Sequence, residues 1–477
     1  MLKLITILGI SLLSYTLLAQ DSASSSFSIK DFSLRDYEAP DIRFKRLNIG
    51  TNMNGYGRGH GDYYSDSHNG DLRMSLYLYG NTDVYQGSSS ASVTYRWQLY
   101  NRRDTLYQDK SNYHRVFLNY SSINRWYVSE KHFFAIHPRV SYQHGLNTGK
   151  YRQDTVYQNS RDIEHAIDLS VFLSMGSGRI QPIAPAREAL NILISLERHN
   201  RLAVAPDSTA IDSLARIANR IQYKRFYDRR FKRIYQLEEL DKGLQEMGLV
   251  THPDMVYAAN LSDIWNYGTN YSRGSGSRWE IGVVPGVKYS FKKQFQDENT
   301  NEHLGEGSNI SGYGFVGWTK KVPLSFSLQS DFSAIISAGY SDNKSNSTYE
   351  IQDTTGVTSQ MINVNYTLGY YPNTRTYLGV TPSVTVSANQ MNSPEEKEEY
   401  LGMTAGIRLN SYYYVSPRFR LSLNGNMSAL SDDYLNQGPL PSSITGGIPL
   451  AIGGNENLTG ENKLSFSYGF SIGYALF

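Results

Sequence analysis

The last fourteen residues of the chain, Leu464–Phe477, alternate between large apolar side chains and small or polar ones. From Leu464 to Leu476, every second residue is leucine, isoleucine, phenylalanine or tyrosine, and the residues between them are serine, glycine or alanine. A period of two places one set on each face of a β-strand. The same pattern recurs along most of the chain, so it determines whether the apolar face of the sheet contacts lipid or a protein core.

The alternation predicts about fourteen strands. Most are roughly as long as the 9–11 residues of a tilted membrane crossing, or longer. Their inner faces are rich in serine, glycine, asparagine and threonine, and their apolar faces carry many of the 38 tyrosines. The expected strands are Ile42–Asn52, Asp71–Tyr79, Ser90–Tyr100, Tyr113–Ser121, Trp126–Gln143, His165–Met175, Arg278–Phe291, Asn309–Trp318, Leu324–Tyr340, Gln360–Tyr370, Tyr377–Asn389, Leu401–Tyr413, Arg418–Ala429 and the terminal strand.

The expected connections alternate in length. Short links are predicted at Ser122–Arg125, Lys320–Pro323, Pro372–Thr374 and Tyr414–Pro417. Long polar links are predicted at residues 58–70, 101–110, 144–164, 292–308, 341–358 and 431–461. Short periplasmic turns and long extracellular loops are typical of outer-membrane barrels, and an even strand number places both termini in the periplasm.

The chain begins with an apolar run after Lys3, which predicts a secretory signal over residues 1–19. Residues 20–40 are serine-rich and charged, and are interpreted as a periplasmic linker. The absence of cysteine excludes a lipoprotein anchor and a thiolate metal site. A formal net charge of only +2 gives no reason to expect nucleic acid as a partner.

Residues 177–267 break the alternation and predict a small helical insert. Pro185 opens a first helix, Asp207 caps a second, a third spans Asp228–Met247 and ends at Gly248, and Pro253 starts a fourth. The middle of the insert is strongly basic. That basic patch either binds an anion or an acidic partner in the periplasm, or is a solvated helix face. Its members are Arg216, Arg220, Lys224, Arg225, Arg229, Arg230, Lys232 and Arg233.

These features predict an all-β transmembrane barrel of about 14 antiparallel strands with a small α-helical periplasmic insertion, located in the cell outer membrane. Residues 41–176 form strands one to six, residues 177–267 the insert, and residues 268–477 strands seven to fourteen. A soluble β-sandwich or propeller is the competing interpretation, since its sheets also alternate.

The chain resembles outer-membrane β-barrels of the Bacteroidota type. The resemblance rests on the leader ending Leu-Ala-Gln, the tyrosine-rich strands and the terminal phenylalanine. The insert segments Gly-Arg-Ile-Gln-Pro-Ile, Ala-Arg-Glu-Ala-Leu, Arg-Phe-Tyr-Asp-Arg-Arg and Asp-Ile-Trp-Asn-Tyr resemble an insert seen in uncharacterised barrels of that group. This resemblance implies a fold and a location, but no activity and no functional residues.

Ten charged residues have the parity of the polar face and are expected to line the lumen. An excess of positive charge there favours anionic solutes, whereas charges that pair across the lumen only brace the wall. The expected lumen-lining residues are Arg73, Arg96, Arg139, Asp168, Glu280, Lys288, Asp331, Arg408, Arg418 and Arg420.

No motif predicts an enzyme, a cofactor or a metal centre. His60, Asp62, Asp66 and His68 lie at irregular spacing in an expected loop, which is weak support for a metal site. His114 has the parity of the outer face, but no serine of matching parity in its strand could serve as its nucleophile.

The sequence therefore predicts a channel for small polar solutes, with a preference for anions if the positive charges of the lumen are unpaired. The alternative is a non-conducting assembly or docking protein whose insert binds an export or envelope complex. Expected partners are outer-membrane lipid, the barrel assembly machinery through the C-terminal strand, and a periplasmic protein or glycan at the insert.

Overall fold

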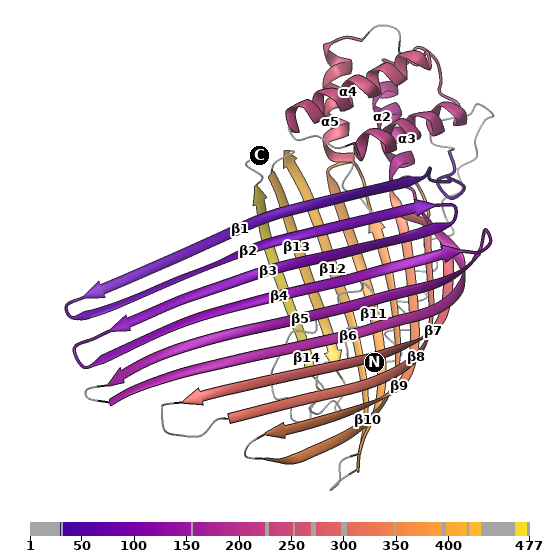
Figure 1. The fold of residues 1–477 in the computed structure, drawn as a ribbon. Coiled ribbons are helices and arrows are strands. Elements are labelled where there is room, and N and C mark those ends of the chain that lie inside the picture. The colour runs from indigo at the N-terminus through magenta and orange to yellow at the C-terminus, as the bar shows by residue number, and fades with distance from the viewer. Residues whose placement is uncertain are drawn as a thin grey trace.

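The computed structural model describes residue 29 and residues 32–153, 156–224, 229–250, 253–268, 273–296, 303–347, 350–392, 397–416, 419–430 and 463–474. The expected signal sequence, Arg418, Arg225 and the terminal Phe477 lie outside these residues. Figure 1 shows a large curved sheet with a group of helices at one end.

Fourteen strands form one sheet in which each strand pairs antiparallel with the next, in chain order from β1 to β14. The predicted fold class and strand number are therefore confirmed. The strands are β1 Ile42–His60, β2 Tyr63–Thr82, β3 Tyr85–Arg103, β4 Tyr107–Tyr127, β5 His132–Gln153, β6 Val156–Pro182, β7 Gly274–Gln296, β8 His303–Pro323, β9 Leu328–Ser347, β10 Glu350–Tyr370, β11 Thr376–Asn392, β12 Lys397–Ser416, β13 Phe419–Leu430 and β14 Lys463–Tyr474.

The register places most of the exposed apolar side chains on one face of the sheet. Met74 of β2, for example, lies opposite Val93 of β3, and Val93 lies opposite Leu118 of β4. These residues are exposed, and on β14 the exposed fraction of Tyr468 reaches 81%. A soluble sheet would bury this face in a core, so the exposed apolar face excludes the sandwich and indicates contact with hydrocarbon.

The strands are much longer than the sequence predicted. They run from 12 residues in β13 to 27 in β6, because most of the expected long polar links belong to extended hairpins. The link expected at residues 58–70 shrinks to Gly61 and Asp62, and that at 101–110 to residues 104–106. Two expected short links were also wrong, since Ser122–Arg125 lies inside β4 and Lys320–Pro323 ends β8.

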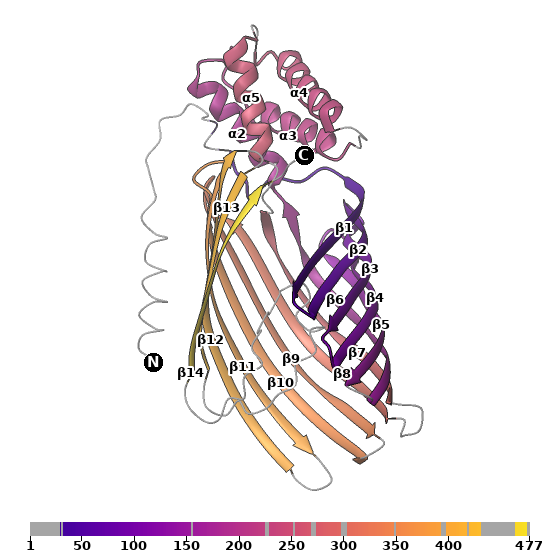
Figure 2. The same cartoon turned by 90° about the vertical axis from the view of Figure 1, so that its left-hand side faces the viewer.

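Four helices lie between β6 and β7, and they form one bundle at the end of the wall where β1 begins and β14 ends (Figure 2). Turns such as residues 324–327 close the hairpins at this end. The helices are α2 Ala184–Arg198, α3 Ser208–Gln222, α4 Arg229–Glu246 and α5 Met255–Gly268.

The local signals for these helices are confirmed. Pro185 occupies the first turn of α2, and the Asp207 carboxylate accepts a hydrogen bond from the Ala210 backbone N–H at the start of α3. Gly248 follows α4 with a φ of 67°, the left-handed conformation that ends a helix. Leucine and isoleucine side chains at helical spacing, such as Leu193 and Ile211, are completely buried between the helices.

The segment interpreted as a linker is packed against the bundle. Ile29, Leu34 and Tyr37 are buried in the same apolar core as α2 to α5. The Arg35 side chain donates to the Pro323 carbonyl at 3.2 Å, and the Ser275 hydroxyl donates to the Arg35 carbonyl at 3.1 Å. This segment therefore joins the bundle to the rim of the wall at β7 and β8.

The two edge strands of the sheet are not paired with each other. Among the described residues, β1 is paired only with β2 and β14 only with β13. Figure 2 shows a space between them on the side facing the viewer. The wall is thus a barrel with a seam, and both strands at that seam expose apolar side chains such as Ile49 and Phe466.

Candidate functional site

The inner face of the wall carries the expected lumen charges. Nine of the ten predicted lumen residues have the register of this face, and Arg418 lies outside the described residues. Arg73 and Arg96 lie toward the β1 edge, and Asp168 lies directly opposite Lys288 in the ladder between β6 and β7. Two of the three acidic residues form ion pairs: Glu280 with Arg125 at 3.4 Å, and Asp331 with Lys321 at 3.2 Å.

Several inner-face charges were missed from the sequence. Arg125 was assigned to a turn, although in β4 its guanidinium is buried beside Glu280. Arg115 has the inner parity of the same strand and pairs with Glu164 at 3.0 Å. The first pair links β4 to β7 and the second links β4 to β6, so both brace the wall across intervening strands, which supports the structural interpretation for these particular charges.

Two arginines nevertheless face each other without an acidic residue between them. Arg96 of β3 and Arg115 of β4 are direct partners in the ladder, and each lies over the Phe117 ring at 5.3 and 5.7 Å. Like charges directly opposite each other destabilise a sheet. Within the described residues, the Glu164 carboxylate pairs with Arg115 but not with Arg96. The Arg96 side chain is exposed, and its ladder partner on β2 is Asp71, with which it forms no ion pair in the described part of the chain.

A compact apolar cluster interrupts the polar inner face. Phe172, Val284, Tyr313, Phe315 and Met361 come from β6, β7, β8 and β10 and are each at least 93% buried. Phe172 and Phe315 meet edge to face with ring centroids 5.9 Å apart. This cluster was not predicted from the sequence, since its members have the parity of a polar face. The packing of this cluster joins β6, β7, β8 and β10 on the inner face.

The bundle is fastened to the rim of the wall by Arg273, which immediately precedes β7. Its guanidinium donates to the Gln329 side-chain oxygen at 3.1 Å and to the carbonyls of Phe326, Ser325 and Leu328 at 2.6–3.0 Å. The Arg273 backbone carbonyl accepts from the Ile183 N–H at 3.1 Å, just before α2. Burial lowers the pKa of Arg273 to about 10, which leaves it charged at neutral pH.

Further contacts hold the bundle at other points around the rim. The Arg375 guanidinium in the turn between β10 and β11 pairs with Asp263 of α5 at 2.6 Å and lies 4.4 Å from the Tyr267 ring centroid. Across the mouth, Tyr223 at the end of α3 stacks on Phe44 of β1 at 4.6 Å. The bundle is therefore fixed to strands from both halves of the wall and lies over that end of it (Figure 2).

The N-terminal half of α2 carries two buried ionisable side chains next to each other in the sequence. Arg187 and Glu188 of α2 are 2% and 1% exposed. The Arg187 guanidinium lies 4.9 Å from the centroid of Tyr371, which follows β10. Neither residue was predicted as a functional residue from the sequence. Their burial depends on the packing of α2 against the rim of the wall, which no local sequence pattern indicates.

Glu188 gives the bundle a predicted pH dependence. Burial raises the pKa of Glu188 well above its ordinary value of 4.5, and the neighbouring Arg187 opposes this shift. The folded bundle keeps a proton that the unfolded chain releases, so its stability should fall as the pH rises above about 4.5. Hydrogen exchange of α2 to α5 at roughly pH 5 and pH 8 measures this, and Glu188→Gln should remove the part of the slope that this carboxyl causes. An unchanged slope in the variant would contradict the assignment.

The basic patch of the insert is not a continuous surface. Arg233 donates to the Ser262 hydroxyl at 2.8 Å inside the bundle, Arg220 pairs with Glu239 at 3.1 Å, and Lys224 lies over the Tyr235 ring. Arg216 and Arg230 are exposed, and Lys232 is half-buried. The side chains of Arg225 and Arg229 lie outside the described part of the chain. The solvated-face interpretation is favoured for these cations.

The remaining sequence candidates show no catalytic or metal-binding arrangement. No group of three or more histidine, aspartate or glutamate residues in the described ranges is arranged to hold a metal ion. His114 bonds the Tyr95 hydroxyl at 2.8 Å on the outer face. None of the helices that the structure describes has both the length and the apolar character needed to cross a membrane.

Comparisons with known proteins give only weak likenesses. No family model matches the chain, and no curated protein matches its sequence. Among solved structures, the chain is similar to the ferric yersiniabactin uptake receptor FyuA from Yersinia pestis, with 8% identity over 83% of this chain and a TM-score of 0.35. The chain spans only 62% of that receptor. It is also similar to the translocator domain of the autotransporter NalP from Neisseria meningitidis, with 8% identity over 80% of this chain and 90% of that domain and a TM-score of 0.21.

The apolar outer face of the fourteen-stranded wall makes this chain an outer-membrane β-barrel.

Proposed function

We propose that this barrel is a channel for small polar, anionic solutes, and that the helical bundle controls its periplasmic mouth. The observation that supports the anion preference is the exposed arginine series on the inner face of β1 to β3, formed by Arg46, Arg73 and Arg96. Acidic side chains partner other cations, at Arg115 and Arg125. Positive charge lining a pore raises the local concentration of anions and lowers that of cations.

Planar-bilayer recording of the purified full chain tests this proposal. With the bundle fastened, we expect small or rare openings that pass chloride in preference to potassium. Arg96→Gln removes one exposed inner cation, so its reversal potential should shift toward that of an unselective pore. Gln98→Asn, a neutral substitution at the next inner-face position of β3, is the matched control and should leave the selectivity unchanged.

A non-conducting docking protein remains the second candidate, because α4 exposes two apolar side chains one turn apart. Phe231 is 64% exposed and Ile234 is 53% exposed on the side of the bundle away from its core. Such a protein would show no conductance even when the bundle is unfastened. Absence of current from both the wild-type chain and an unfastened variant would therefore refute the channel and favour docking.

A further inference from the structure

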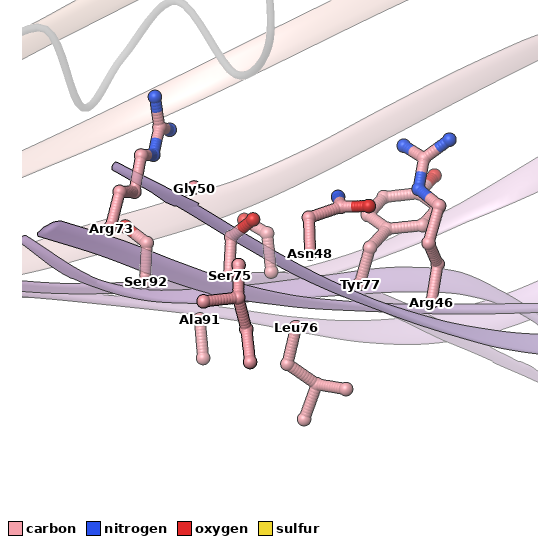
Figure 3. A pocket seen from close by; sticks show the side chains of 11 residues that line it. Arg46, Asn48, Gly50, Arg73, Ser75, Leu76, Tyr77, Ala91 and Ser92 are labelled. Atoms are coloured by element: carbon pink, nitrogen blue, oxygen red, sulfur yellow. The ribbon is translucent and has the colours of Figure 1, made fainter. Parts of the chain in front are cut away.

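The wall beside the seam holds an open pocket of about 530 Å³ between β1, β2 and β3, with both polar and apolar lining residues. Figure 3 shows Arg46 and Arg73 projecting from the same side of the sheet, with Asn48, Ser75 and Ser92 between them. Leu76 and Ala91, which also border the pocket, point to the opposite side and belong to the outer face. The part of the pocket that faces the lumen between the two arginines, here called its floor, is therefore formed by the amide of Asn48 and the hydroxyls of Ser75 and Ser92.

The two guanidiniums bracket this floor at a fixed spacing. Arg46 lies opposite Tyr77 in the ladder, and Tyr77 is four residues along β2 from Arg73. Four residues of strand span about 13 Å, so the backbone sites of the two cations are separated by roughly that distance. No acidic residue lines the pocket, and within the described residues no carboxylate pairs with either arginine. The pocket thus suits one elongated ligand with an acidic group near each end.

The groups between the arginines narrow the ligand class. Asn48, Ser75, Ser90 and Ser92 can exchange hydrogen bonds with ligand hydroxyls along the whole floor. The single aromatic ring, that of Tyr77, already has the Arg46 guanidinium 5.7 Å from its centroid. Stacking of a nucleobase is therefore disfavoured, whereas a chain of hydroxylated sugar units meets a complementary surface. We infer that this pocket binds an acidic oligosaccharide that carries at least two carboxylate groups.

This inference rests on the proposed channel for its biological setting, but it can be measured without any ion current. The full chain is purified in detergent, and binding of trigalacturonate is measured by calorimetry at low salt. Maltotriose tests the need for acidic groups, and monomeric galacturonate tests the need for two of them. We expect trigalacturonate to bind more tightly than either, and its affinity to fall as salt is added.

Arg46→Gln and Arg73→Gln should each weaken trigalacturonate binding roughly tenfold, the value of one exposed charge-assisted contact. Lys288→Gln removes the same charge from the inner face of β7, away from the pocket, and should have little effect. Retained heat-modifiable migration in gels shows that each variant is folded. Equal binding of maltotriose, or equal losses in the Lys288 and arginine variants, would overturn the site.

The outcomes for the site and for the channel are separable. A protein that binds trigalacturonate but never conducts refutes the channel and leaves the site. A protein that conducts with anion preference but does not bind this probe refutes the site and leaves the channel.

Discussion

Leu423→Lys should destabilise the folded barrel in lipid by about 2–4 kcal/mol, the cost of placing a lysine on the lipid face of a barrel near mid-membrane. Leu423 is 54% exposed on β13, and on the outer face it lies between Phe470 of β14 and Ser411 of β12. A lysine there would face hydrocarbon, which cannot solvate the ammonium group. Urea titration of the protein folded into phosphocholine vesicles measures this change in the free energy of unfolding.

Asn424→Lys is the matched control for this experiment. Asn424 is the next residue of β13, at nearly the same depth, and lies opposite Asn410 on the inner face. Its side chain is exposed to the lumen, so a lysine there should change the free energy of unfolding by only a few tenths of a kcal/mol. Equal destabilisation by both substitutions would contradict the assignment of lipid and lumen faces.

Arg273→Ala should release the helical bundle from the rim. The substitution leaves the oxygens of Gln329, Phe326, Ser325 and Leu328 without the donor that now serves all four. Removing one side of a buried hydrogen-bonded set costs about 3 kcal/mol here, since each stranded acceptor loses part of its solvation. Amide exchange in α2 and α5 should accelerate roughly a hundredfold, and bilayer recordings should show larger and more frequent openings.

Arg420→Ala provides the comparison for this release. Arg420 lies on the inner face of β13, where its guanidinium is exposed and is 5.9 Å from the ring centroids of Tyr412 and Tyr414. Its loss should leave the exchange rates of the bundle unchanged. If Arg273→Ala accelerates exchange but the current stays the same, the bundle is fastened as described but does not control the mouth.

The sequence predicted the wall correctly because lipid and lumen impose opposite demands on alternate residues. The pairing of Met74 with Val93 and Leu118 across three strands follows directly from their shared parity. Helix ends were equally predictable, because the Asp207 cap and the Gly248 stop depend only on residues close to them in the sequence.

The sequence failed where polar residues occupy both faces. Residues 63–70 of β2 contain tyrosine, serine, aspartate, histidine, asparagine and glycine, so they give no alternation, yet they pair with β1 throughout. Ser122 was read as part of a turn, although its hydroxyl bonds Ser89 at 2.6 Å across the ladder. That error hid Arg125, the partner of the predicted inner residue Glu280. Extended hairpins beyond the membrane carry no hydrophobic signal by which they could be recognised.

The candidate site was only half predictable. Inner arginines such as Arg73 and Arg96 follow from parity, but their grouping beside the seam depends on which strands are neighbours and in which register. Contacts between the insert and the rim, such as that of Arg273 with Gln329, join segments 56 residues apart and leave no local pattern. Whether an inner charge is paired or exposed could not be read from the sequence.

The shared core of the N-terminal segment and the bundle has a consequence for biogenesis. Leu34 and Tyr37 precede β1, whereas the helices they pack against follow β6, so the globular unit is complete only after six membrane-spanning elements have been laid between its halves. Closing so large a chain loop is entropically costly until those elements are ordered. We therefore expect the unit formed by the N-terminal segment and the helical bundle to fold late. Its compact state would then indicate that β1 to β6 have already been inserted into the membrane.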